Sequence, residues 1–454
     1  MLRVLMISPH FPPDSGAATH RVRLLAPHLP KYGWEPTVVT VDPSAYEGRL
    51  DFELAHLVSD TLRVVRCRAW SARWTRRFGF GDLGLRALLG LYRACAELLS
   101  REKFDLLFIT IFPAYPALLG PILRQRFSVP YIVDYQDPWV SAWGVHAGGG
   151  PNGEADLKSK ASRWIATRLE PIALRRAGAI TAVSAGTYDQ ILERIPELKS
   201  IPRAAIPMGG EPSDFQYLRQ HPRYNPFFDP ADGLFHVCYV GTLLPLGFET
   251  LRAVLEAVRL LRDHRTDLYR RLRLHFFGTS NQASPEEPCR VLPVAAEFGV
   301  REAVSEIASR IDYLDALTVQ CQASAILLMG SSESHYTASK LYPALLAGRP
   351  ILAVYHHASS VVDVLRSSSA TARIVTYDDE IRAESQSSKI YEGLVAAMNW
   401  NLARGPNLGP DSIAGFSAES LAGTLCTIFD RVSSVARLDP AGVPLVDVPQ
   451  KPAL

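Results

Sequence analysis

Short apolar runs alternate with helical patterns along most of this chain. The runs have the length of buried strands and lie at 2–8, 37–41, 104–111, 129–135, 179–183, 235–240, 272–277, 325–329, 351–354 and 374–377. Between them, apolar residues recur at helical spacing, as in Val22, Leu25 and Leu29, with Pro27 expected to kink that helix and Gly33 to end it. This alternation predicts an α/β fold built on parallel strands.

A proline-rich stretch between 196 and 234 divides the pattern into two halves. It holds seven prolines, at 196, 202, 207, 212, 222, 226 and 230. Strand–helix alternation stops there and restarts at Phe235, so we expect two α/β halves joined by a linker, with a cleft between them. The last amphipathic helix is expected at 417–432, and the proline-containing residues 436–454 are expected to be a poorly ordered tail.

Composition narrows the class of protein. The chain has 454 residues, of which 47% are hydrophobic and 21% charged, as in soluble globular proteins. A net charge of +2 argues against a generic nucleic-acid binder. The six cysteines form no C-x-x-C pair, so we expect neither a zinc site nor a disulfide framework, which fits a cytoplasmic protein. We also expect no signal peptide and no transmembrane helix.

Residues 61–81 carry six arginines and no acidic residue. Four aromatic residues are interleaved with them: Trp70, Trp74, Phe78 and Phe80. One interpretation is a peripheral contact with an anionic membrane surface, at the inner face of the membrane. The other is a strand and loop whose aromatic side chains are core and whose arginines are solvated.

One βαβ unit in the second half carries the clearest candidate site. A strand at 325–329 is followed by a polar loop, a short helix and a strand at 351–354. Because proline is tolerated only in the first turn of a helix, Pro343 places the helix start close to Ser339. Free amides, a hydroxyl and Lys340 would then form an anion site, most simply for phosphate. Alternatively, Ser339 is an ordinary N-cap and Lys340 a solvated charge.

Other candidate residues follow strands, where ligands bind in open α/β sheets. Gly16 and Ala17 lie in a small-residue loop after the first strand, and Asp137 directly follows the strand at 129–135. Gly241, Thr242 and Gly278 follow two strands of the second half. Plain turns would also use these residue types.

Five segments, in order, resemble the GT-B glycosyltransferases, specifically the retaining nucleotide-sugar enzymes of family 4. They are LRVLMISPHFPPDSGAATHRVRLLA, PYIVDYQDPW, IPMGGEPSDF, HVCYVGTL and SKLYPALLAGRPIL. The second is similar to a DxRDPW segment, and the last to SKLYEYLAAGKPIL. The resemblance covers about residues 1–433.

The resemblance implies two Rossmann-like domains facing a central cleft. Residues 1–215 would bind the acceptor and 216–411 the nucleotide-sugar donor, with a helix at 412–435 crossing back to the first domain. A sugar would pass from a nucleotide-diphosphate-sugar co-substrate to a glycan, lipid-linked or small-molecule acceptor, as in polysaccharide biosynthesis. The reaction would retain the anomeric configuration and need no metal or other cofactor.

The resemblance also assigns roles to residues. Ser339 and Lys340 would contact the diphosphate, which Gly16 would let the first domain approach. Asp137 would orient the acceptor hydroxyl or take its proton, with His10 a further candidate facing the cleft. The remaining donor-binding candidates are Ala17, Gly241, Thr242, Gly278, Glu333, Tyr336 and Leu341.

The sequence departs from the family pattern at the donor site. Pro343 stands where this branch carries a ribose-binding glutamate, and Thr242 and Leu246 fall near positions of a family Arg and Lys. Gln136 replaces the arginine of the DxRDPW segment. Two alternatives therefore remain: a catalytically silent GT-B partner subunit, and a non-hydrolysing sugar-nucleotide epimerase.

Overall fold

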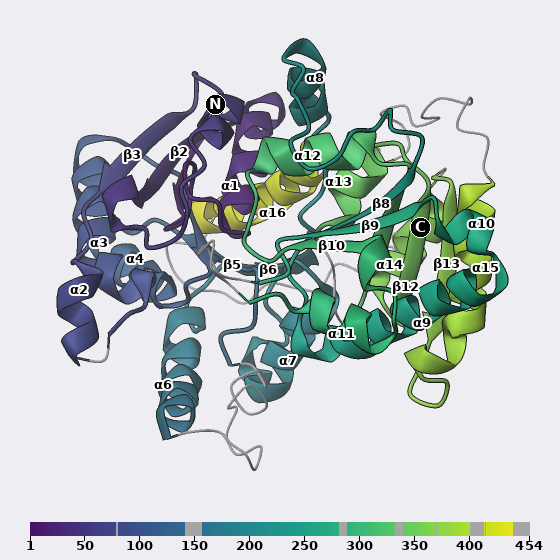
Figure 1. Ribbon diagram of the computed structural model, residues 1–454. Helices are drawn as coiled ribbons and strands as arrows, with labels where there is room; N and C mark the ends of the chain where they lie inside the picture. Colours follow the sequence, from purple (N-terminus) through teal and green to yellow (C-terminus); the bar gives the residue numbers. More distant parts are fainter. Residues whose placement is uncertain are drawn as a thin grey trace.

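The chain folds around two parallel β-sheets in a computed structural model (Figure 1). The structure describes residues 1–78, 80–140, 157–280, 288–331, 339–368, 370–399, 413 and 415–438. The first sheet has seven strands in the order β3-β2-β1-β4-β5-β6-β7. Their bounds are β1 (Leu2–Ile7), β2 (Trp34–Val41), β3 (Arg63–Cys67), β4 (Leu106–Ile111), β5 (Tyr131–Tyr135), β6 (Ala179–Ala182) and β7 (Arg203–Ala205).

Helices cover both faces of this sheet because its central strands are buried on both sides. They include α1 (Thr19–Leu25), α3 (Leu83–Arg101), α4 (Leu119–Phe127), α6 (Leu157–Leu174) and α7 (Ala185–Arg194). In β1, Leu5 and Ile7 face one apolar cluster, with residues of α3 and α4, while Val4 and Met6 face another. This period of two is the expected alternation of a strand.

The last helix, α16 (Ala418–Leu438), returns to the first sheet, as expected. Leu425 and Phe429 of α16 join the apolar cluster that contains Val4 and Met6. The indole nitrogen of Trp34 donates to Asp430 on α16 at 2.9 Å. The final helix is thus part of the core of the first domain.

The second sheet has six strands in the order β10-β9-β8-β11-β12-β13. Their bounds are β8 (Phe235–Val240), β9 (Leu272–Phe277), β10 (Val304–Ile307), β11 (Ala325–Met329), β12 (Ile351–His356) and β13 (Ala372–Tyr377). The flanking helices are α9 (Phe248–His264), α10 (Thr266–Tyr269), α11 (Val291–Glu297), α12 (Tyr313–Gln322), α13 (Leu341–Leu346), α14 (Ser360–Ser367) and α15 (Ser387–Met398). The predicted α/β architecture with two parallel sheets is confirmed.

Local details differ from the sequence-based expectation. The α-helix α1 ends at Leu25, and Pro27 lies in the first turn of a 3-10 helix over Ala26–Tyr32 that ends at Gly33, where φ is 85°. The proline-rich linker contains a helix of its own, α8 (Pro212–Gln220). Segment 61–81 contains β3 and a short helix, α2 (Ala72–Thr75). None of the described helices combines the length and apolar character needed to span a bilayer.

A fully buried ion pair joins α1 to β5. The Arg21 guanidinium donates to both oxygens of Asp134, at 2.8 and 2.7 Å. Its remaining nitrogen donates to the carbonyls of Ile206 and Pro207, within the proline-rich stretch that joins the two halves. The hydroxyl of Thr181 on β6 also donates to Asp134, at 2.6 Å. Every charge of the pair is therefore compensated, as burial requires.

The two domains meet through polar contacts between loops at the carboxyl ends of the strands. Arg310, which follows β10, donates to the carbonyl of Ser15 at 2.5 Å. Arg49 pairs with Asp312 at 2.7 Å, and Asp51 accepts from the amide of Tyr313. The loops that follow β1 and β10 therefore face one another across the domain interface.

Removing one partner of the buried pair should destabilise the first domain strongly. We expect Arg21→Met to lower the free energy of unfolding by about 3–5 kcal/mol, because Asp134 would remain buried without its countercharge. Urea unfolding followed by circular dichroism measures this loss. Arg101→Met is the control: its pair with Glu97 is exposed and contributes less than about 1 kcal/mol. A loss as small as that of the control would contradict the structural role of Arg21.

Candidate functional site

Lys340 lies at the point where the strand order of the second sheet changes direction. β8 is the first strand of that sheet along the chain, and its neighbours β9 and β11 lead away in opposite directions. Such a switch point, at the carboxyl ends of the strands, is where open α/β sheets bind ligands. The Lys340 ammonium donates to the Tyr239 hydroxyl at 2.6 Å and lies 4.2 Å from the centre of that ring. Tyr239 in turn donates to the carbonyl of Thr242 at 2.9 Å.

The ammonium group has lost much of its hydration. Burial lowers the pKa of Lys340 from its ordinary value to about 7. Within the part of the chain that the structure describes, no carboxylate forms an ion pair with it. Since an opposite charge favours the protonated lysine, an anion bound here would raise this pKa again.

Gly241 makes room for Lys340. Its φ is +136°, and a Cβ at this position would lie 3.2 Å from the Cδ of Lys340. A larger residue would therefore strain the backbone and press on the lysine. Gly278, after β9, also has a positive φ, of +70°. Both glycines stand at carboxyl ends of neighbouring strands, as the sequence predicted.

The helix beside Lys340 differs from the expectation. Helix α13 has six residues and begins at Leu341, with Lys340 itself at the N-cap position and no side-chain cap. Ser339 is exposed and does not cap it, and Leu341 is buried in the core. Because so short a helix has a small dipole, the positive charge at this point comes mainly from Lys340.

In the first domain, Asp14 organises the small-residue loop. Its carboxylate accepts hydrogen bonds from His10 Nδ1 and Thr19 Oγ1, each at 2.8 Å. A Cβ on Gly16 would lie 2.9 Å from that carboxylate, so glycine is needed there. Burial raises the pKa of Asp14, but the bonds from His10 and Thr19 outweigh it and hold the pKa below its ordinary value. The neighbouring Ala17 is exposed.

This pairing sets the tautomer of His10. An ionised carboxylate can only accept, so His10 carries a proton on Nδ1, which leaves Nε2 for another partner. The ring is held by stacking on Tyr46, with 5.9 Å between centroids, and by Phe112 at 6.0 Å. His10 is thus oriented as a proton acceptor would be.

Asp137 stands just beyond β5, at the same sheet edge as His10. Its side chain is accessible to solvent, yet surrounding protein atoms partly desolvate it and raise its pKa to about 6. β4 lies between β1 and β5, so the chain positions that follow β1 and β5 are about 10 Å apart. The side-chain nitrogen of Gln136 is buried without a hydrogen-bond partner among the described residues. Among the described residues, the Gln136 amide therefore has an unused hydrogen-bond donor at this edge of the sheet.

Three residues at the domain interface were not foreseen from the sequence. Arg310 follows β10 and is partly desolvated, which lowers its pKa, while the nearby charge of Asp14 opposes that effect. The ring of His20 packs on Tyr313, with 4.7 Å between centroids, and burial holds the pKa of His20 well below its ordinary value. The position of Arg310 directly after a strand was the available signal.

Several predicted residues remain separate. Among the described residues, no hydrogen bond or ion pair joins His10, Asp137 and Lys340 to one another. Glu333 and Tyr336 lie outside the described residues. The described part of the chain contains no cluster of three or more His, Cys, Asp or Glu side chains that could hold a metal ion.

A family comparison matches the first domain. Residues 16–209 match the family described as Glycosyl transferase 4-like domain. The matched range begins at Gly16 and includes Asp137. A comparison of the sequence with curated proteins gave no match.

Solved structures share the whole architecture. An α,α-trehalose 6-phosphate synthase from Burkholderia multivorans aligns with a TM-score of 0.59 and 11% identity, over 98% of this chain and 100% of that one. The N-terminal domain of a Candida albicans trehalose-6-phosphate phosphatase gives 0.59 and 12% identity, over 94% and 97%. A trehalose-6-phosphate structure from E. coli, bound with UDP-2-fluoro glucose, aligns with a TM-score of 0.53 and 11% identity, over 96% of this chain and 97% of that one. At 11 and 12% identity these alignments show a shared fold alone. The chain therefore has the GT-B fold, and its residues 16–209 match a glycosyl transferase 4-like domain.

Proposed function

We propose that this protein transfers a sugar from a nucleotide-diphosphate-sugar to an acceptor hydroxyl, with the donor diphosphate bound at Lys340. The observation that carries the proposal is the partly desolvated ammonium at the switch point of the second sheet, beside Gly241. Two structural neighbours support this class of donor. One is bound with UDP-2-fluoro glucose, and another is a UDP-forming α,α-trehalose-phosphate synthase. A neighbour in complex with glucose-6-phosphate supports a small-molecule acceptor as one candidate, beside a glycan or a lipid-linked acceptor.

The proposed chemistry needs charge stabilisation more than proton transfer. As the bond between the anomeric carbon and the phosphate oxygen breaks, negative charge develops on the departing diphosphate. Lys340 becomes fully charged when it meets this anion and stabilises it inside a partly dry site, without a metal ion. The acceptor oxygen forms the new bond to the anomeric carbon, and we assign retention of configuration to the reaction.

Asp137 serves the acceptor in this proposal. A carboxylate with a pKa of about 6 is ionised at neutral pH and still basic enough to orient a hydroxyl and accept its proton. His10 Nε2 is the second group able to accept a hydrogen bond at the same sheet edge. Gly16, Gly278 and Thr242 would line the donor without charge of their own.

A catalytically silent partner subunit is the second candidate. It is favoured by Pro343, which lies within α13 and supplies no carboxylate for a ribose. Nucleotide binding without release of nucleoside diphosphate in the presence of any acceptor would favour this alternative over transfer.

We also propose that segment 61–81 contacts an anionic membrane surface. The alternative that its aromatic side chains form core does not hold for Trp70, Trp74 and Phe80, which are 61%, 67% and 54% exposed. Arg73 and Arg77 are exposed beside them. Basic and aromatic side chains together suit the interface of an anionic bilayer.

Nucleoside diphosphate binding should depend on the protonation of Lys340. Because its pKa is about 7 in the free protein and rises beside an anion, binding at higher pH must take up a proton. We expect the affinity for the preferred nucleoside diphosphate to fall by up to about tenfold per pH unit between pH 8 and 9.5. Calorimetric titration with UDP, GDP, ADP and TDP measures this dependence.

Lys340→Met should weaken that binding about 10- to 100-fold at pH 7 and remove its pH dependence. Lys389→Met is the matched control, since Lys389 is an exposed lysine on α15. The donor assignment would be overturned if Lys340→Met bound the nucleoside diphosphate with unchanged affinity. It would also be overturned if the wild-type protein bound none of UDP, GDP, ADP and TDP.

Asp137→Asn should lower the rate of transfer about 100-fold or more and leave donor affinity unchanged. In the wild-type protein, kcat/KM should rise as pH increases through about 6, because Asp137 ionises there. The release of nucleoside diphosphate in the presence of acceptor gives the rate. Asp189→Asn, an exposed carboxylate on α7, is the control. An equal loss of donor binding and turnover would indicate a structural role for Asp137.

Replacing Arg73 and Arg77 together by Gln should weaken binding to phosphatidylglycerol vesicles about 30-fold at low salt, at roughly 1 kcal/mol per arginine. Vesicle co-sedimentation measures it. Replacing the exposed Arg366 and Arg431 by Gln changes the net charge equally and should have little effect. Equal losses in both double variants would show that only net charge matters, against a specific surface.

A further inference from the structure

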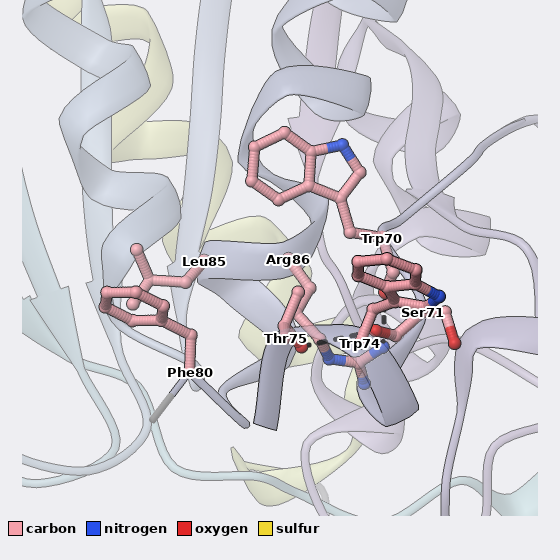
Figure 2. A pocket seen from close by; sticks show the side chains of 7 residues that line it. All are labelled: Trp70, Ser71, Trp74, Thr75, Phe80, Leu85 and Arg86. Carbon is pink, nitrogen blue, oxygen red and sulfur yellow. Dashed lines mark hydrogen bonds between the residues drawn. The ribbon is translucent and has the colours of Figure 1, made fainter. Parts of the chain in front are cut away.

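An apolar hollow of about 640 Å³ opens beside the start of α3 (Figure 2). Trp70 and Trp74 lie on one side of it, and Phe80 and Leu85 on the other. Its surface is apolar, although it lies within the most basic segment of the sequence. A volume of this size falls within the range of small-molecule sites.

Arg86 holds the backbone around the hollow in place. It is buried, and its guanidinium donates to the carbonyl of Trp70 at 2.9 Å, to that of Gly81 at 3.3 Å and to that of Ala45 at 3.1 Å. The amide of Trp70 donates back to the Arg86 carbonyl at 3.0 Å. One charged side chain thus fixes the backbone on both sides of the hollow.

The aromatic walls are held by further backbone bonds. The amide of Phe80 donates to the carbonyl of Thr75 at 3.0 Å, and that of Trp74 to Ser71 at 3.1 Å. The three aromatic rings are nevertheless more than half exposed. Exposed apolar side chains that gather around a hollow are typical of an interaction site or a ligand-binding groove.

The start of α3, which contributes Leu85 to the hollow, lies near His10. Leu85 lies one turn after Asp82, the N-cap of α3, whose carboxylate accepts from the Leu85 amide at 2.9 Å. Pro113 and Pro116 lie against Gly84 of α3, and the neighbouring Phe112 packs on His10, with 6.0 Å between ring centroids. The Leu85 side of the hollow is therefore near one of the residues assigned to the acceptor.

We propose that this hollow binds the aliphatic chain of a lipid-linked acceptor, whose polar head lies toward His10 and Asp137. The inference rests on the proposed transfer function and names its acceptor class. A sugar would not suit the hollow, since its hydroxyls would lose hydrogen bonds to water and gain none from an apolar wall.

Contact with a bilayer surface is a different mode of binding from a single chain inside the hollow. A membrane surface would bind the outward faces of the aromatic rings but would not need a hollow between them. A single chain that enters the hollow should bind from solution as a monomer. Each buried methylene should strengthen its binding about fourfold.

Calorimetric titration with alkyl phosphates below their critical micelle concentrations tests this proposal on the full chain. We expect affinity to rise about fourfold per methylene from butyl to octyl phosphate, and to level off once the hollow is full. Trp74→Ala should weaken octyl phosphate binding about tenfold or more. Trp164→Ala, an equally exposed tryptophan on α6 at 60%, should leave it unchanged. Thermal unfolding of both variants checks that the fold is intact.

The results of these titrations distinguish a single chain bound in the hollow from contact with the bulk membrane. If Trp74→Ala weakens binding to phosphatidylglycerol vesicles while monomeric octyl phosphate does not bind the wild-type protein, the segment contacts bulk membrane and the inference is wrong. Affinity that is independent of chain length, or equal in both tryptophan variants, would also overturn it. Nucleoside diphosphate titration of the same samples tests the donor site separately: chain binding without nucleotide binding would refute the transfer function, and the reverse would refute only the acceptor class.

Discussion

The buried pair between Arg21 and Asp134 fixes the helix and the strand that border the candidate residues of the first domain. Arg21 belongs to α1, the helix that follows the loop of His10, Asp14 and Gly16. Asp134 is a residue of β5, three positions before Asp137. The remaining bonds of Arg21 hold the carbonyls of Ile206 and Pro207, within the proline-rich stretch between the two domains. One desolvated interaction therefore fixes α1, β5 and this stretch relative to one another, and its low-dielectric surroundings make any incomplete pairing costly.

A second buried pair extends this arrangement into the linker. Arg23, two residues further along α1, donates to both oxygens of Asp214 on α8, at 2.9 and 2.8 Å. Asp214 also accepts from the hydroxyl of Tyr313, the first residue of α12 in the second domain. Burial raises the pKa of that tyrosine well above its ordinary value, with the charge of Asp214 adding to the rise, so its hydroxyl remains a donor. The domain interface is thus directional and polar, which suits two domains that must keep a fixed orientation around a substrate.

The site around Lys340 is built on the opposite principle, since its main charge is left without a countercharge among the described residues. Lys340 is held by a neutral tyrosine and by the space that Gly241 leaves, and its pKa is close to neutrality. Such a site stores no ion pair that a substrate would have to break. An anion bound there would supply the missing countercharge and favour the protonated lysine.

The sequence by itself determined the α/β fold in two halves, and the resemblance to a known family predicted the return of the last helix, while the role of Lys340 stays a prediction. The fold follows from local rules: apolar runs of strand length and the helical spacing between them. Only the tertiary structure showed that Ser339 does not cap α13, that Asp14 rather than a free loop amide lies beside Gly16, and that Arg310 meets Ser15 across the domains. It also showed that Trp70 and Trp74 of the arginine-rich segment are exposed, although the sequence allowed them to be core. Contacts between residues far apart in the chain depend on how the elements pack, and no periodicity along the sequence encodes them.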